Sequence, residues 1–94
     1  MNVLAIGTLT GKDIQPHLEA EQVKVTELRE AGLIRDVFLK ADQTGPVLLL
    51  NDVDANEAER QLATLPFIEE DLVTFDFVEL ITIEERRQRA AAGD

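Results

Sequence analysis

Apolar and polar residues follow one another in blocks that predict strands and helices in turn. Val3–Leu9 is a mainly apolar run that leads into threonine and glycine, which is typical of a buried strand. Apolar residues then recur at spacings of three, four and seven, and this period predicts a helix that extends to about Ala31. Asp13 or Gln15 can cap its start, and Gly32 follows as the left-handed residue that commonly ends a helix.

Two short strands are predicted after this helix. Leu33–Lys40 and Val47–Leu50 are apolar runs, and the turn between them contains Asp, Thr, Gly and Pro, which favour bends. The second run has four aliphatic residues without polar alternation, so we expect it to be buried on both faces. In the run Leu33–Lys40, side chains that alternate between the two sides of a strand predict one face with Val37 and Leu39 and another with Ile34 and Phe38.

The rest of the chain predicts a second helix, a last strand and a short C-terminal helix. Asp54 and Glu57 have the spacing of a capping box at the start of the second helix, and Pro66 is expected to end it. Leu72–Ile81 reads as the last strand. Another capping box opens the segment 82–94, which we expect to be a helix with a frayed end.

The resulting order, β-α-β-β-α-β in 94 residues, indicates a single α+β domain. We expect a four-stranded antiparallel sheet with both helices on one face. The other face carries apolar residues, and only the short C-terminal segment is left to cover it. Because an exposed apolar face usually marks a partner surface, we expect two copies to pack sheet against sheet as a homodimer. A small pocket is expected between the sheets and the helices.

Charge and composition exclude several classes of function. The chain has 9 basic and 19 acidic residues, and this surface repels phosphate backbones and anionic lipids, so neither nucleic acid nor a membrane is an expected partner. The start of the chain lacks a basic segment followed by an apolar run, so no signal peptide is predicted. The absence of Cys excludes disulfides and thiolate metal sites and suits a cytoplasmic location.

Glu21 is the candidate general base. It occupies a place in the apolar stripe of the first helix, which consists of Ile14, Leu18, Val25 and Leu28. Partial desolvation there would raise the pKa of its carboxyl group, as a general base requires. His17, the only histidine, lies four residues earlier and is the candidate proton relay. The competing interpretation, which we weigh more heavily, is that both are ordinary residues near a helix N-terminus.

Arg35, Asp36 and Asp76 are candidate substrate-binding residues. The guanidinium of Arg35 can hold a carboxylate in a bidentate fork, and the two acids stand within apolar strands that could line the open sheet face. Alternatively, Arg35 pairs with an acid, and the two aspartates mark a solvated rim or a protected edge strand. One His and scattered acids predict no metal site. No cofactor is expected, since no phosphate-binding glycine loop is present.

From about residue 21 to residue 80 the chain resembles the muconolactone isomerase family. The residues that carry the resemblance are Glu27-Leu28, Gly32, Arg35, Asp52-Val53, Leu65-Pro66-Phe67 and Glu79-Leu80. The resemblance implies a ferredoxin-like subunit that dimerises into an α/β barrel, often within larger rings. It also implies a cofactor-free enzyme that moves a double bond in a small lactone by proton transfer. Under this resemblance Glu21 falls on a helix glutamate of the family and Arg35 on a family arginine.

Two functions therefore remain open. The first is a cofactor-free isomerase or lyase that acts on a small acidic or cyclic metabolite, with Glu21 as base, His17 as relay and Arg35 as substrate anchor. The second is a non-catalytic module for small-molecule binding or oligomeric assembly. A cofactor-free oxygenase, which this fold also hosts, would need an aromatic-lined pocket, and 4% aromatic residues argue against one.

Overall fold

The computed structural model describes residues 1–93, and the environment of side chains through residue 90. The elements in chain order are β1 (Asn2–Leu9), a 3₁₀ turn η1 (Gln15–His17), α1 (Leu18–Glu30), β2 (Ile34–Leu39), β3 (Pro46–Leu50), α2 (Ala55–Leu62), α3 (Pro66–Glu69), β4 (Val73–Leu80) and α4 (Ile83–Gly93). This order confirms the predicted α+β domain.

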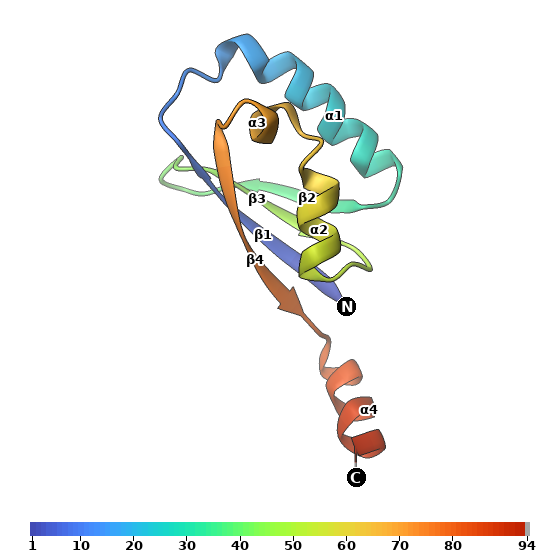
Figure 1. Ribbon diagram of the computed structural model, residues 1–94. Coiled ribbons are helices and arrows are strands. Elements are labelled where there is room, and N and C mark those ends of the chain that lie inside the picture. Colours follow the sequence, from blue (N-terminus) through green and yellow to red (C-terminus); the bar gives the residue numbers. More distant parts are fainter. Residues whose placement is uncertain (94) are drawn as a thin grey trace.

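The four strands form one antiparallel sheet in the order β2-β3-β1-β4, as in a ferredoxin-like fold. The helices α1, α2 and α3 lie over one face of this sheet (Figure 1). The core between the helices and the sheet consists of Val3, Ala5, Leu28, Ile34, Leu48, Leu50, Ala58, Leu62 and Leu65. The helix α1 packs mainly beside β2 and α2 beside β4 and β1, and the buried residues of both helices join the same core.

Both ends of the first helix follow from local sequence. The Asp13 side chain accepts a hydrogen bond from the Gln15 N–H at 3.0 Å, and the chain enters α1 through one 3₁₀ turn that contains Pro16. At the other end Gly32 has φ +87°, and its N–H donates to the Arg29 carbonyl, while the Leu33 N–H donates to the Leu28 carbonyl. These two bonds form a Schellman motif, which confirms Gly32 as the helix stop.

A β-bulge in β2 makes the predicted faces of this strand wrong. Ile34 pairs with Leu50 and Asp36 pairs with Leu49, so one extra residue, Arg35, lies between consecutive pairs. The extra residue shifts the alternation by one position. Ile34 therefore shares the helix-covered face with Val37 and Leu39, and Phe38 shares the opposite face with Asp36.

Pro66 has a different role from the predicted one. The helix α2 ends at Leu62, four residues earlier, and Pro66 is the first residue of the short helix α3. Proline is favoured at this position because a first-turn N–H has no partner inside the helix. The consequence for the site is that the Phe67 N–H, the first that α3 has, donates to Glu21 of α1.

One face of the sheet is left open. Strand pairing arranges its side chains in two rows, Asp36-Leu49-Leu4-Val78 and Phe38-Val47-Ile6-Asp76. Phe38 and Val78 are 55% and 44% exposed. The residues of β3 on this face, Val47 and Leu49, are only half-buried, so the expectation that β3 is buried on both faces is not met within one copy of the chain.

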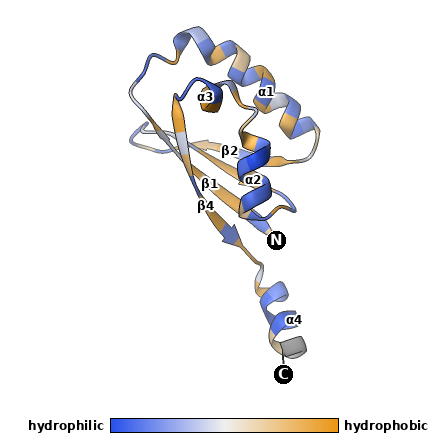
Figure 2. Ribbon diagram, viewed as in Figure 1, coloured by the Kyte–Doolittle hydropathy of each residue, from blue (hydrophilic) through white to orange (hydrophobic). Residues whose placement is uncertain are grey.

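The helix α4 does not cover the open face. It begins with the predicted capping box, in which the Glu85 N–H donates to Thr82 Oγ1 at 3.0 Å and the Thr82 N–H donates to Glu85 Oε1 at 3.4 Å. From there it projects away from the sheet and lengthens the molecule to 53 Å (Figure 1). Hydropathy along the ribbon is high in the strands and low at the start of α4 (Figure 2).

Candidate functional site

The candidate site is a cavity of about 470 Å³ between α1 and the sheet. It is lined by Glu21, Gln22, Val25, Thr26 and Arg29 of α1, Val37 of β2, Pro46 and Leu48 of β3, and Phe75 of β4. This volume is within the range of small-molecule sites, and most of the wall from the sheet is apolar. The predicted pocket between sheet and helices is therefore present within one copy of the chain.

The floor of the cavity depends on a glycine in β1. A Cβ atom at Gly7 would lie 2.9 Å from the ring carbon Cε1 of Phe75 and 2.8 Å from the carbonyl oxygen of Pro46. Real side chains do not approach so closely, so only glycine lets the Phe75 ring lie across β1 towards β3. Phe75 belongs to the edge strand β4 and contributes to the cavity because of this space.

Glu21 is the acidic group of the cavity wall. It is half-buried, and its Oε1 accepts a hydrogen bond from the backbone N–H of Phe67 at 3.0 Å. Burial raises the pKa of the Glu21 carboxyl above its usual value, and the Phe67 hydrogen bond partly offsets this rise in pKa. The predicted placement of Glu21 within the apolar stripe is consistent with this environment. Within the described residues, no protein group donates to its second oxygen, Oε2.

The polar end of the cavity is formed by the last two turns of α1. Thr26 Oγ1 donates to the Gln22 carbonyl at 2.9 Å, so this hydroxyl is occupied within the helix. Arg29 is exposed at the cavity rim. Arg29 is not among the site residues predicted from the sequence. The available signal was its spacing, since Arg29 follows Val25 by four residues and therefore lies on the same helix face.

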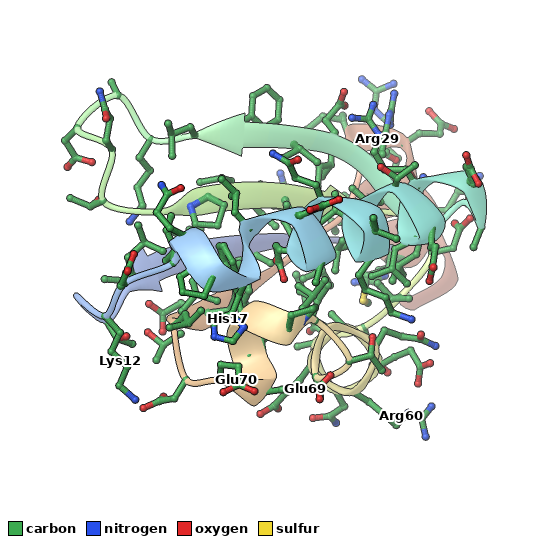
Figure 3. All side chains as sticks on the ribbon, turned by 90° about the horizontal axis from the view of Figure 1, so that it is seen from above. Lys12, His17, Arg29, Arg60, Glu69 and Glu70 are labelled. Carbon is green, nitrogen blue, oxygen red and sulfur yellow. The ribbon has the colours of Figure 1, made fainter. Side chains whose placement is uncertain are left out.

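His17 lies apart from Glu21. It is the last residue of the 3₁₀ turn, where three residues complete a turn, so the four-residue spacing no longer aligns the two side chains. Figure 3 shows His17 on the α3 side of α1, whereas Arg29 lies at the opposite end of the helix near β2. His17 is absent from the cavity wall, and the described part of the chain has no hydrogen bond between His17 and Glu21.

The three predicted substrate-binding residues also lie outside the cavity. Arg35 is the bulge residue of β2, and its Nε is 4.0 Å from Asp36 Oδ2, both side chains being at least half exposed. Asp36 and Asp76 stand on the open sheet face, at the β2 edge and the β4 edge respectively. The sheet therefore separates these two carboxylates from Glu21.

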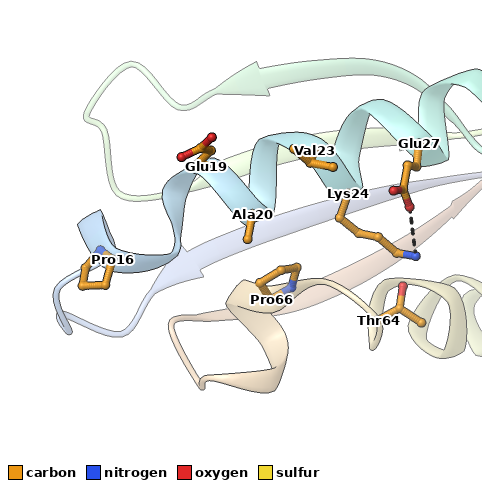
Figure 4. Close-up of a pocket in the computed structure, with 8 residues that line it drawn as sticks. All are labelled: Pro16, Glu19, Ala20, Val23, Lys24, Glu27, Thr64 and Pro66. Carbon is orange, nitrogen blue, oxygen red and sulfur yellow. Dashed lines mark hydrogen bonds and ion pairs between the residues drawn. The ribbon is translucent and has the colours of Figure 1, made fainter.

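A second hollow lies between α1 and the connection from α2 to α3, outside the cavity (Figure 4). Its volume of about 550 Å³ exceeds that of the cavity, and it is lined by Pro16, Glu19, Ala20, Val23, Lys24, Glu27, Thr64 and Pro66. Lys24 and Glu27 pair with each other at 3.4 Å, and most of the lining is exposed to solvent. A solvated ion pair binds a ligand poorly, so we take the cavity beneath α1 as the site.

The described residues contain no cluster of three or more His, Asp or Glu side chains that could hold a metal ion. Within the same part of the chain, no helix has the length and apolar character needed to cross a membrane.

Comparison with known proteins identifies the fold of the chain but assigns it to no family. No family model matches the chain, and no curated protein matches it in sequence. Among solved structures the chain is similar to 5-chloro-2-hydroxyhydroquinone dehydrochlorinase (TftG) from Burkholderia phenoliruptrix AC1100, in its complex with 2,5-dihydroxybenzoquinone. The TM-score is 0.67 and the sequence identity is 16%, over 90% of this chain and 98% of that chain. At this identity the likeness shows the fold alone.

Proposed function

We propose that this protein is a cofactor-free enzyme that transfers a proton within a small acidic or cyclic molecule, as an isomerase or a lyase. The observation that carries the proposal is a half-buried carboxylate, Glu21, in the wall of a cavity of ligand size. The raised pKa of Glu21 brings the carboxylate closer to the basicity that general base catalysis requires. The ferredoxin-like fold shared with a small-molecule dehydrochlorinase supports the same class of function.

The chemistry uses the free oxygen of Glu21. The Phe67 N–H holds Oε1, so Oε2 is the atom available to accept a proton from a C–H group next to a substrate carbonyl. The C–H electron pair then moves into the conjugated system. In an isomerase the protonated Glu21 returns the proton to a different carbon, and in a lyase the electron pair expels a leaving group. The apolar wall of Leu48 and Phe75 limits water around the carbanion.

The other sequence-predicted residues stay predictions within this proposal. His17 as relay, and Arg35, Asp36 and Asp76 as binding residues, all lie away from the cavity in a single copy of the chain. Membership of the muconolactone isomerase family, suggested by Arg35 and the Leu65-Pro66-Phe67 segment, is likewise part of the proposal.

We also propose that the protein works as a homodimer whose copies pack through their open sheet faces. The two rows on this face place six apolar side chains together, namely Leu4, Ile6, Phe38, Val47, Leu49 and Val78. The described part of the chain leaves this apolar area uncovered, because α4 points away from it. A second copy offers a matching surface, as two-fold symmetry requires.

The test compares Glu21→Gln with Glu19→Gln. Both residues are on α1, but Glu19 is exposed on the outer surface and away from the cavity. The probes are muconolactone and a set of five- and six-membered ring ketones and hydroxyquinones, and the readout is solvent deuterium incorporation followed by NMR. We expect Glu21→Gln to lower the exchange rate by about 100-fold or more, as the loss of a general base does, and Glu19→Gln to leave it unchanged.

The Glu21→Gln variant separates catalysis from structure. Its amide side chain keeps an oxygen that can accept from the Phe67 N–H, so the fold should survive, and circular dichroism checks this. Exchange that persists in Glu21→Gln would remove Glu21 as the base. The second candidate function, a non-catalytic binding or assembly module, is favoured by the same hydrogen bond, because capping of α3 is a sufficient structural role for Glu21.

A further inference from the structure

The cavity has one charged group of each sign, at opposite ends of the same helix face. Among its described lining residues Glu21 is the only acid and Arg29 the only base. They are eight residues apart on α1, which corresponds to roughly 12 Å along the helix axis. The wall between them includes the apolar side chains of Val25, Leu48 and Phe75, together with the uncharged polar residues Gln22 and Thr26. A ligand that fills the cavity therefore meets a cation at one end and a carboxylate at the other.

Arg29 is available to a ligand. Within the described part of the chain the ion pairs of the other cations near α1 are Lys24 with Glu27 and Arg35 with Asp36, and Arg29 forms none. Other described cations also lack an ion pair, among them Lys40 and Arg86, but Arg29 is the one that lines the cavity. Arg29 lies in the last turn of α1, where a cation interacts favourably with the helix dipole. This interaction does not require the residue to border a cavity.

We propose that the cavity binds a small organic anion with a single-ring body, and that Arg29 holds the anionic group. A carboxylate or an ionised acidic hydroxyl group matches the guanidinium, which can donate two parallel hydrogen bonds. The ring packs on Leu48 and Phe75. If the proposed function holds, this orientation directs the end of the ligand remote from its charge towards Glu21, and the acidic C–H group lies at that end.

A matched pair of probes tests the charge preference. Benzoate and benzamide have nearly the same shape, but only benzoate carries a negative charge. We expect wild-type protein to bind benzoate about fivefold more tightly than benzamide in NMR titrations at low salt, as one solvent-accessible charged contact allows. Ring protons of bound benzoate should show nuclear Overhauser contacts to methyl groups of Val25 and Leu48.

The variants assign the preference to one residue. Arg29→Gln should abolish the difference between benzoate and benzamide while benzamide binding stays unchanged, and Arg29→Lys should keep part of it. Arg60→Gln is the matched control, since Arg60 of α2 is paired with Glu57 outside the cavity, and it should keep the full preference. Equal binding of both probes by the wild type, binding of neither at millimolar concentration, or a preference that survives Arg29→Gln would each overturn the inference.

This experiment can fail independently of the proposed function. Glu21→Gln tests turnover at the other end of the cavity and should not remove the benzoate preference. Loss of the preference in Arg29→Gln together with unchanged turnover in Glu21→Gln would support the anion site and refute the catalytic role. The reverse pattern would support the base and refute Arg29 as the anchor.

Discussion

At the scale of single residues, Glu21 combines two opposing influences. Its carboxyl group is partly removed from water, which favours the neutral form, and it also accepts the Phe67 N–H, which favours the charged form. Burial has the larger effect, so the pKa of Glu21 is raised. Ionisation of Glu21 in the folded protein therefore lowers the free energy of unfolding. A neutral side chain that accepts the Phe67 N–H would cap α3 without this loss.

This cost should be visible in the pH dependence of stability. Because the pKa of Glu21 is higher in the folded than in the unfolded state, its favourable contribution is complete below the unfolded pKa, near 4.5. The contribution is lost as pH rises through the folded pKa. Glutamine mimics the neutral form at every pH. We expect the stability of Glu21→Gln relative to the wild type to be higher at pH 7 than at pH 4.

Urea unfolding of both proteins at the two pH values measures this difference. Glu19→Gln serves as the control, because its exposed side chain should give the same relative stability at both values. A relative stability of Glu21→Gln that stays constant or falls between pH 4 and pH 7 would contradict a raised pKa at this site.

The residues of the site differ in how far sequence alone can predict them. Glu21 is predictable because an acid among Leu18 and Val25 must be partly desolvated once the helix packs. His17 is not, because a 3₁₀ turn before Leu18 changes the angular spacing, and no sequence rule marks that turn. For Arg29 the spacing from Val25 predicts only a shared helix face, because its role depends on a cavity whose floor requires Gly7 to admit a ring from β4.

At the scale of elements, the predicted order is correct and the errors lie at junctions. The capping signals at Asp54 and Thr82 both begin helices, because a side-chain acceptor for a first-turn N–H is a local requirement. The bulge at Arg35 was not predictable, since it depends on how β2 pairs with β3, a strand that comes later in the chain. Tertiary pairing, not local preference, decides such a shift.

Only half of the capping box at α2 forms, and this defines a sharp test. Asp54 Oδ1 accepts the Glu57 N–H at 2.8 Å, but the Glu57 carboxylate bonds to Arg60 and Gln61 and not back to the cap. The first turn of α2 is therefore capped by the Asp54 side chain at the Glu57 N–H and by Glu79 Oε2, which accepts the Ala55 N–H at 2.9 Å. We expect Asp54→Ala to lower the free energy of unfolding by about 1 kcal/mol in urea titrations.

Asp54→Ser is the matched control for this cap. Serine keeps an oxygen that can accept the Glu57 N–H, so most of the stability should return. Since Asp54 is remote from the cavity wall, benzamide binding should be the same in both variants. Equal destabilisation by alanine and serine would show that the charge of Asp54, and not its hydrogen bond, supports α2.

At the scale of the whole molecule, the sheet divides the protein into two unequal surfaces. The helix-covered side contains the core and the cavity, and it is complete within one copy of the chain. The open side has apolar residues in the middle of both rows, and carboxylates only on the edge strands, at Asp36 and Asp76. This distribution is typical of an interface with an apolar centre and a polar rim.

The homodimer can be tested by placing a charge on this face. Val78 is 44% exposed on the open face, and Val23 is 56% exposed on the outer side of α1, so Val78→Asp and Val23→Asp introduce the same change on opposite surfaces. We expect the wild type and Val23→Asp to sediment at twice the monomer mass of 10.5 kDa. The Val78→Asp dimer should dissociate at least tenfold more readily, because a buried unpaired carboxylate faces the partner.

Circular dichroism should show that the Val78→Asp monomer is folded, since position 78 is solvent-accessible in a single copy. A wild type that is monomeric at micromolar concentration, or a Val78→Asp variant as dimeric as Val23→Asp, would show that the two sheets do not pack together.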